Sequence, residues 1–153
     1  MNRSLLGLIV LALVVAIVAI PALASGSDGK GRVIELSGVT TSMGVALDAK
    51  PKGDSAGDIG YVVGKLTKNG KPFGRFHGTC FLFAKETSHC TFTAGLPDGQ
   101  LILESSYGPG FNTGATALEA IVGGTGAYEG ARGQGRDSEV GQNGLRLHLE
   151  LLP

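Results

Sequence analysis

Short runs of β-branched, aromatic and other apolar residues recur along this chain from residue 32 to its end, and glycine-rich turn signals separate them. Short runs bounded by turn residues are typical of strands joined by tight turns. After residue 24, no long window has the 3.6-residue apolar period of an amphipathic helix. The pattern predicts eight strands, over residues 32–37, 58–67, 73–84, 89–94, 100–106, 116–122, 131–139 and 145–152.

Glycine supplies 26 of the 153 residues, far above the usual share of ~7 %. No Gly-X-Y period is present, which excludes collagen, and an apolar content of 42 % excludes a disordered linker. The 13 basic residues balance the 13 acidic ones, so we expect no nucleic-acid partner. Glycine is therefore expected mainly in the turns, corners and bulges of a folded domain.

Residues 1–24 have the pattern of a secretory signal peptide. Arg3 is the basic start, residues 5–20 form an uncharged apolar run, and residues 22–24 (ALA) match the small-x-small cleavage pattern. We therefore expect a secreted or extracytoplasmic protein whose single domain covers residues 25–153. The alternative is an uncleaved membrane anchor, although the run is shorter than the ~20 residues of a spanning helix.

The two cysteines, Cys80 and Cys90, lie where two predicted strands meet over a tight polar turn. Pairing residues whose numbers sum to the same value places Cys80 opposite Cys90 and Phe81 opposite His89. Export favours a disulfide between them, and closing so small a loop would stabilise the fold by about 3 kcal/mol. Two buried thiols are the alternative.

The last predicted strand alternates strictly. Leu145, Leu147, Leu149 and Leu151 share one face, and polar residues occupy the other. Such alternation places one face in a core and the other toward polar surroundings. Sequential hairpins favour an up-and-down meander, whose closure into a barrel would remove its exposed edges. A sandwich remains the alternative.

Motifs for common chemistries are weak. The glycine cluster of residues 123–135 lacks the spacing and the following helix of a nucleotide-binding loop, so we expect a tight corner between strands. His77, His89 and His148 are too scattered to predict a metal site. No G-x-S-x-G motif is present to indicate a hydrolase.

Glu35 is the strongest single candidate for chemistry. It lies between Ile34 and Leu36 in a largely apolar predicted strand. In an apolar lumen, desolvation would raise its pKa and prepare it for acid/base work. The alternative is a glutamate that faces solvent. Glu119, within the apolar run TALEAIV, has the same ambiguity with weaker support.

Residues 120–133 (AIVGGTGAYEGARG) resemble the strand, glycine corner and following strand of the allene oxide cyclase-like barrel family, which neighbours the dirigent proteins. The opening Gly57-Asp58, residues 74–80 (GRFHGTC) and Asp98-Gly99-Gln100 are also similar to that family. The resemblance implies a closed eight-stranded antiparallel up-and-down barrel with an apolar lumen, commonly assembled as a homotrimer.

The resemblance also implies a function. Family members hold a reactive small molecule in one conformation while it isomerises, cyclises or couples, and need no cofactor. Glu35 is similar to the lumen glutamate of the cyclases, so it is the expected catalytic residue. The other cyclase positions are not matched as clearly. Asp58, Tyr61 and Phe92 are the expected ligand-binding residues.

The expected partner is therefore a small apolar or aromatic molecule. The alternative functions are a non-catalytic carrier of hydrophobic molecules, a cell-envelope interaction module, and a structural barrel whose loop 107–115 binds a partner.

Overall fold

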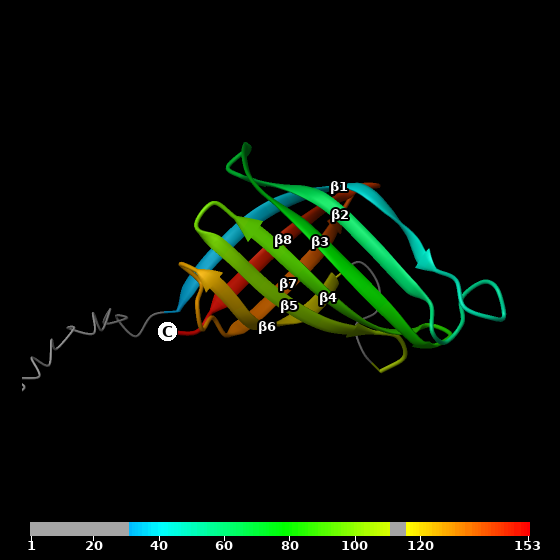
Figure 1. Ribbon diagram of the computed structural model, residues 1–153. Helices are drawn as coiled ribbons and strands as arrows, with labels where there is room; N and C mark the ends of the chain where they lie inside the picture. The colour runs from blue at the N-terminus through cyan, green and yellow to red at the C-terminus, as the bar shows by residue number, and fades with distance from the viewer. Residues whose placement is uncertain (1–30, 111–115) are drawn as a thin grey trace, which may run out of the picture.

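The computed structural model describes residues 31–110 and 116–153, which form a closed β-barrel (Figure 1). Each strand pairs antiparallel with the next one in sequence, and the last strand returns to pair with the first. The predicted eight-stranded up-and-down barrel is therefore confirmed. Its strands are β1 (Arg32–Leu47), β2 (Ile59–Lys68), β3 (Lys71–Ala84), β4 (Thr87–Leu96), β5 (Gly99–Tyr107), β6 (Thr116–Gly126), β7 (Gly133–Val140) and β8 (Gly144–Leu151).

Two predictions concern segments outside the described residues. The signal peptide of residues 1–24 is one, and residues 111–115 of the proposed partner-binding loop are the other. In the described part of the chain, no helix has the length and apolar character needed to cross a membrane.

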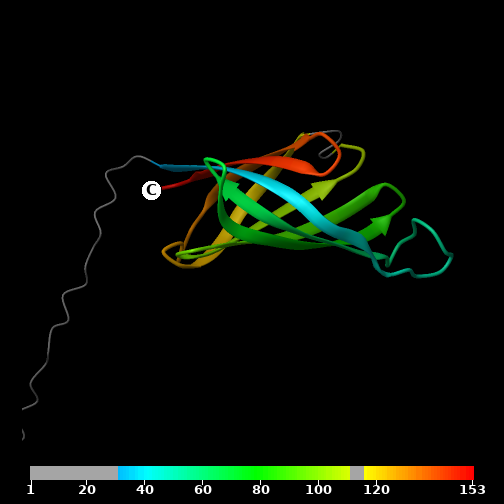
Figure 2. The same ribbon diagram turned by 90° about the horizontal axis from the view of Figure 1, so that it is seen from above.

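Alternation along the strands decides which side chains fill the barrel. In β8, Leu147, Leu149 and Leu151 are buried, whereas Arg146 and Glu150 are exposed. The same inward face continues from β8 to β1, because buried Ile34 of β1 pairs with buried Leu149 of β8. Figure 2 shows these two strands side by side. The apolar face predicted for the last strand therefore forms part of the core.

The first strand is longer than predicted. The sequence indicated a strand that ends at Ser37 and a loose stretch after it, but β1 continues to Leu47. Its second half pairs with β2 from Val39 to Leu47, with register shifts between Thr40 and Ser42 and again before Leu47. Glycine and serine weaken the local strand signal here, and pairing with β2 stabilises this half of the strand.

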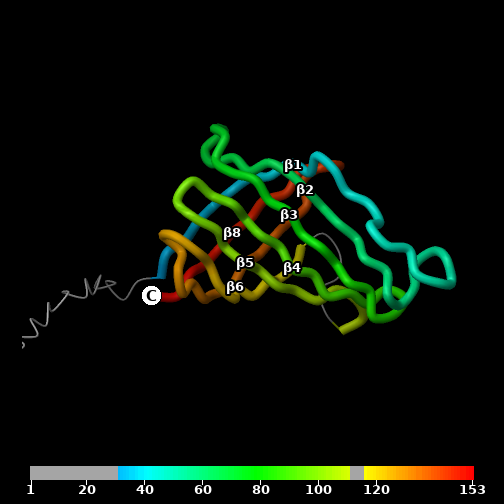
Figure 3. Tube along the Cα trace, viewed as in Figure 1, coloured from blue at the N-terminus to red at the C-terminus, as the bar shows by residue number. Residues whose placement is uncertain are grey.

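The two ends of the barrel differ (Figure 3). At one end, which we call the closed end, β1 begins, β8 finishes, and short turns join β2 to β3, β4 to β5 and β6 to β7. Tyr128, in the β6–β7 corner, is buried here, and the Arg32 guanidinium lies 5.2 Å from the centre of its ring. The hydrophobic core at this end also contains Ile34, Leu101 and Leu149.

The opposite end, which we call the mouth, is where the 48–58 loop joins β1 to β2 and a tight turn joins β3 to β4. The first strands extend farthest at this end (Figure 1). Met43 and Val45 of β1 pair with Val62 and Gly60 of β2, which face the lumen side, and both are exposed here. We call these two exposed apolar side chains on the lumen side of the mouth the apolar rim.

The predicted disulfide is present between Cys80 of β3 and Cys90 of β4. The predicted register is also correct, since Cys80 pairs with Cys90 and Phe81 with His89. The expected corner is also present. Gly126 ends β6 and Gly133 begins β7, both at positive φ, which glycine adopts at least cost.

Candidate functional site

A cavity of about 50 Å³ lies inside the barrel, beneath the mouth. Aromatic and aliphatic side chains of β3, β4, β5 and β8 form most of its wall, and two carboxyl groups complete it. The residues that matter most are Phe76, Phe92, Leu103, Glu119, Asp137 and Leu147. Pockets that enclose a whole drug-sized ligand are roughly 300–1,000 Å³, so this cavity holds a small group or a few waters.

Three glycines on the lumen face make room for the larger side chains of this wall. A Cβ at Gly64 would lie 2.1 Å from the Phe76 ring, and one at Gly78 would lie 2.2 Å from the Phe92 ring. A Cβ at Gly135 would come within 3.2 Å of Glu119 Oε2. Each ring therefore occupies space over a strand position that has no side chain. These glycines add a role in the lumen to the one expected in turns and corners.

Glu119 is the buried carboxyl group of the lumen, with 6 % of its surface exposed. Within the described residues, its Oε2 atom has no hydrogen-bond partner. Burial raises the pKa of Glu119 to about 8, and the negative charge of Asp137 adds to the rise. Glu119 is therefore mostly protonated at neutral pH, and its carboxyl group is able to donate a hydrogen bond or a proton.

Asp137 and Tyr107 are the titratable neighbours of Glu119 toward the mouth. Asp137 accepts a hydrogen bond from the Ala117 backbone N–H at 3.1 Å, and burial raises the pKa of its carboxyl group. Burial is also the main cause that raises the pKa of Tyr107 to about 12, with the charges of Asp137, Glu119 and Glu139 adding to it. The site is therefore acidic and partly dehydrated.

Rows of cross-strand partners connect the apolar rim with a residue of the cavity wall. Met43 pairs with Val62, Val62 with Gly78, and Gly78 with Phe92, so all four residues share the lumen face. The next row toward the mouth contains Val45 and ends, by way of the disulfide, at Ser105. The apolar rim and Phe92 of the cavity wall therefore lie on the same face of the sheet.

The expected lumen position of Glu35 is wrong. Ile34 and Leu36 take the inner face of β1, so alternation turns Glu35 outward, and 58 % of its side chain is exposed. There its carboxylate contacts His148 Nδ1. Glu119, the weaker candidate of the sequence, is the glutamate that the barrel encloses.

The three expected ligand-binding residues lie in different places. Phe92 lines the lumen cavity. Tyr61 is 38 % exposed on the outer face of β2, beside Gly44 of β1. Asp58 is buried, but its carboxylate accepts hydrogen bonds from the backbone N–H groups of Ala49 at 2.7 Å and Ser55 at 2.9 Å.

These contacts explain the position of Asp58. The Ser55 backbone hydrogen bond is the largest of the effects that hold the pKa of Asp58 below its usual value. The carboxylate therefore orders the 48–58 loop, and the structure does not bring it to the lumen cavity.

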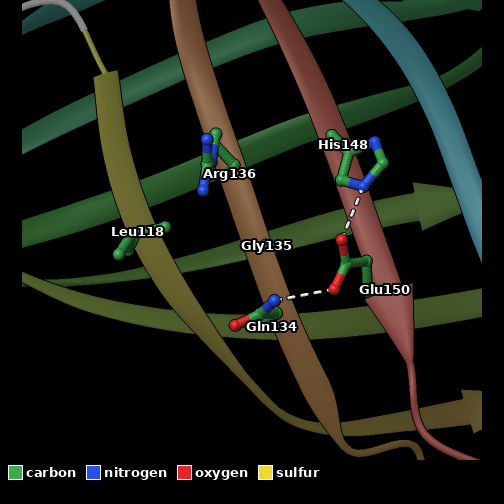
Figure 4. Close-up of a pocket in the computed structure, with 6 residues that line it drawn as sticks. All are labelled: Leu118, Gln134, Gly135, Arg136, His148 and Glu150. Atoms are coloured by element: carbon green, nitrogen blue, oxygen red, sulfur yellow. Dashed lines mark hydrogen bonds and ion pairs between the residues drawn. The ribbon is translucent and has the colours of Figure 1, made fainter.

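A second hollow, of about 270 Å³, lies on the outer surface over β6, β7 and β8. Figure 4 shows its lining, where Gln134 donates to Glu150 at 2.6 Å and His148 Nε2 contacts Glu150 at 2.9 Å. Hydrogen bonds to Glu35 and then Glu150 raise the pKa of His148. Charges of both signs are thus already paired across this open surface.

Sequence reasoning missed Asp137 and Tyr107. Asp137 lies in the polar run of β7 (GQGRDSEV), which has no apolar alternation to reveal its inner face. The pairing of Asp137 with Leu147 would have revealed that face, because the leucines of β8 point inward. Tyr107 ends β5 beside a predicted loop, where strand periodicity gives no direction.

No protein-family model matches the sequence, and no curated protein sequence matches it. Solved structures do match. A pyocyanin demethylase aligns with a TM-score of 0.69 and 25 % identity, over 78 % of this chain and 99 % of that one. The pterocarpan synthase dirigent protein PsPTS1 aligns with a TM-score of 0.59 and 17 % identity, over 82 % and 95 %. The Diels Alderase AbmU from Streptomyces koyangensis aligns with a TM-score of 0.58 and 14 % identity, over 82 % and 70 %.

These structures share the closed barrel, and the glycine corner that suggested the resemblance joins β6 to β7. The chain described here has the allene oxide cyclase-like barrel fold that is also the fold of the dirigent proteins.

Proposed function

We propose that this protein is an exported barrel that binds a small apolar or aromatic molecule at its mouth and guides its isomerisation, cyclisation or coupling. The observation that carries the proposal is Glu119, a buried carboxyl group that lines the lumen cavity and whose Oε2 atom has no hydrogen-bond partner among the described residues. Buried polar groups are almost always hydrogen-bonded, and the exceptions concentrate at functional sites. Glu119 takes the acid/base role that the sequence assigned to Glu35.

The similar structures support the general kind of function. Two carry the titles pterocarpan synthase dirigent protein and Diels Alderase, and a third is a pyocyanin demethylase, so each acts on a small molecule. In this barrel, the protonated Glu119 would polarise an acceptor atom of the ligand at neutral pH, and its carboxylate would accept a proton above about pH 8. Phe92 would hold the ligand against it.

The disulfide supports an exported location, because disulfides persist mainly in oxidising compartments. The signal peptide of residues 1–24 remains part of this proposal.

We further propose that the chain assembles as a homotrimer through an outer apolar face on β1, β2 and β3. That face consists of Val39, Tyr61, Val63, Phe81 and Phe83, all exposed. Apolar surface of this extent usually marks a contact site.

The proposal is tested with 5-nitrobenzisoxazole, a small neutral aromatic probe that reports a carboxylate base in an apolar site. The base takes the proton on C3 of the ring, the N–O bond breaks, and a coloured cyanophenolate forms. We expect ring opening on the order of 10²-fold faster than with free acetate, rising with pH through about 8. Glu119→Gln should abolish the acceleration.

Two matched variants serve as controls. Glu35→Gln changes a glutamate on the outer face and should retain the full rate. Phe92→Ala should raise KM several-fold, whereas Tyr61→Ala, which removes an outer-face aromatic, should not. Loss of activity in Glu35→Gln with retention in Glu119→Gln would overturn the assignment. Saturable binding of the probe without ring opening would favour a carrier instead.

A further inference from the structure

The lumen cavity has an unbalanced charge. Its lining includes the carboxyl groups of Glu119 and Asp137 and no lysine or arginine, and Glu139 follows Asp137 toward the mouth. Apart from Thr93, the remaining wall is apolar, with two aromatic rings from Phe76 and Phe92. An anion that entered would meet like charge in a poorly hydrated space, whereas a cation would meet carboxyl groups and the faces of aromatic rings.

The size of the cavity independently limits the group that it can hold. At about 50 Å³, it accommodates a group of a few heavy atoms and not a whole ring system. The apolar rim lies nearer the mouth, with Met43 71 % exposed and Val45 65 % exposed on the lumen side of β1. The lumen side thus carries a small acidic cavity and, nearer the mouth, exposed apolar side chains.

The carboxyl group of Glu119 is an independent indication that the lumen cavity binds a ligand. The residue is more than nine-tenths buried, lines the cavity, and has an Oε2 atom without a hydrogen-bond partner in the described part of the chain. Gly135 opposite it leaves the space in which that carboxyl group lies, because a Cβ there would contact Oε2 at 3.2 Å. A donor group placed in the cavity would satisfy the free oxygen.

We propose that the lumen cavity takes the cationic head group of a ligand, such as a protonated primary amine, whose apolar or aromatic body lies against the apolar rim. This inference rests on the proposed function and specifies its ligand class. The carboxylate of Glu119 contacts the head group directly, Asp137 adds negative charge, and Phe76 and Phe92 contribute cation–π attraction. A carboxylate-bearing ligand is rejected by the same groups.

Binding of a cation then releases a proton. Glu119 is largely protonated at neutral pH, and a cation beside it favours the ionised form. The other titratable groups beside it are Asp137 on β7 and Tyr107 on β5, and Glu139 lies next to these two toward the mouth. From β4 and β8, the cavity is lined by uncharged residues, among them Phe92, Ala94, Leu145 and Leu147.

Three naphthalene probes of matched size test this inference: 2-naphthylmethylammonium, 2-naphthalenemethanol and 2-naphthoate. Their binding is measured by isothermal titration calorimetry at pH 7, in phosphate and in Tris, whose different ionisation enthalpies report proton exchange. We expect the ammonium to bind about tenfold or more tightly than the naphthoate. We also expect it to release about one proton per molecule bound.

Variants assign the effect to the cavity. Glu119→Gln should remove the proton release and most of the preference for the cation, and Asp137→Asn should weaken the preference with the proton release retained. Glu35→Gln, on the outer face, should behave as the wild type. Thermal unfolding of each variant shows that it is folded.

The outcomes separate this inference from the proposed function. Equal binding of all three probes, or tighter binding of the naphthoate, would overturn the cationic head group and leave small-molecule binding intact. Proton release that persists in Glu119→Gln would also overturn it. If none of the three probes binds, the ligand class and the proposed function fail together.

Discussion

At the scale of single residues, the barrel keeps a carboxyl group where its ionised form is unstable. In the unfolded chain Glu119 titrates near its ordinary pKa of 4.5, whereas in the folded barrel burial raises that pKa to about 8. Between these values the folded state holds a proton that the unfolded state has lost. The free energy of unfolding therefore falls as pH rises through this range.

The first prediction follows from this difference. The contribution of Glu119 to stability is fully present below about pH 4.5 and is lost as pH rises through about 8, a change on the order of 5 kcal/mol. Asp137, whose pKa is also raised, acts in the same direction. Glu119→Gln should flatten the decline in Tm between pH 5 and pH 8, measured by calorimetry across that range.

A matched control is Glu129→Gln. Glu129 is exposed in the β6–β7 corner, so its removal should leave the pH dependence of Tm as in the wild type. The assignment of the pH dependence to Glu119 is wrong if Glu119→Gln and the wild type lose stability in parallel.

Glu35 and Glu119 also show what single-residue reasoning achieves. Each follows an apolar residue and precedes a small or apolar one, so alternation restricts each to one of two faces without saying which face is inner. The cross-strand partners of each glutamate show which face is the inner one. Glu35 pairs with His148 on the outer face, whereas Glu119 pairs with Gly135 in the lumen. The sequence alone could identify both candidates but not choose between them.

At the scale of elements, the β3–β4 hairpin was the most predictable part of the fold. A tight turn fixes register locally, so the position of the turn was enough to pair Cys80 with Cys90. The full length of β1 was not predictable, because its second half depends on pairing with β2 across a loop. Local signals thus predict hairpins better than strands that are stabilised by distant partners.

The disulfide of this hairpin gives the second prediction. It joins two adjacent strands at the mouth, and Cys90 is almost fully buried. Cys80→Ser/Cys90→Ser should lower the free energy of unfolding by about 3 kcal/mol, measured by urea denaturation, because the bond restricts the unfolded chain. The double variant in the presence of dithiothreitol serves as the control, since the reductant should change only the wild type. A midpoint that dithiothreitol leaves unchanged in the wild type would argue against a bond in the purified protein.

At the scale of the whole molecule, closure of the barrel could not be deduced from strand signals alone, which left a sandwich open. It depends on the pairing of β1 with β8, the two strands farthest apart in sequence. The glycine corner and the resemblance based on it indicated the correct architecture. Closure leaves the described strands without a free edge, so self-association through strand pairing is not available to them.

Assembly would therefore use side chains on the outer surface, and the outer apolar face of β1, β2 and β3 is the main candidate. Phe81 and Phe83 lie edge to face with their ring centres 5.1 Å apart, and Phe83 is 60 % exposed. Burying these rings against a second copy would remove apolar area from water, at roughly 25 cal/mol per Å². Cyclic symmetry would repeat the same contact around a trimer.

The last prediction tests that assembly with a chain that consists of residues 25–153. Multi-angle light scattering coupled to size-exclusion chromatography should give three times the monomer mass for the wild type. Phe81→Glu/Phe83→Glu should give the monomer mass, because two charges at the centre of the contact would have to be desolvated. Val140→Glu places a charge on exposed apolar surface of β7, outside that face, and should leave the trimer intact. A monomeric wild type, or a trimer that survives the double substitution, would show that this face does not form the contact.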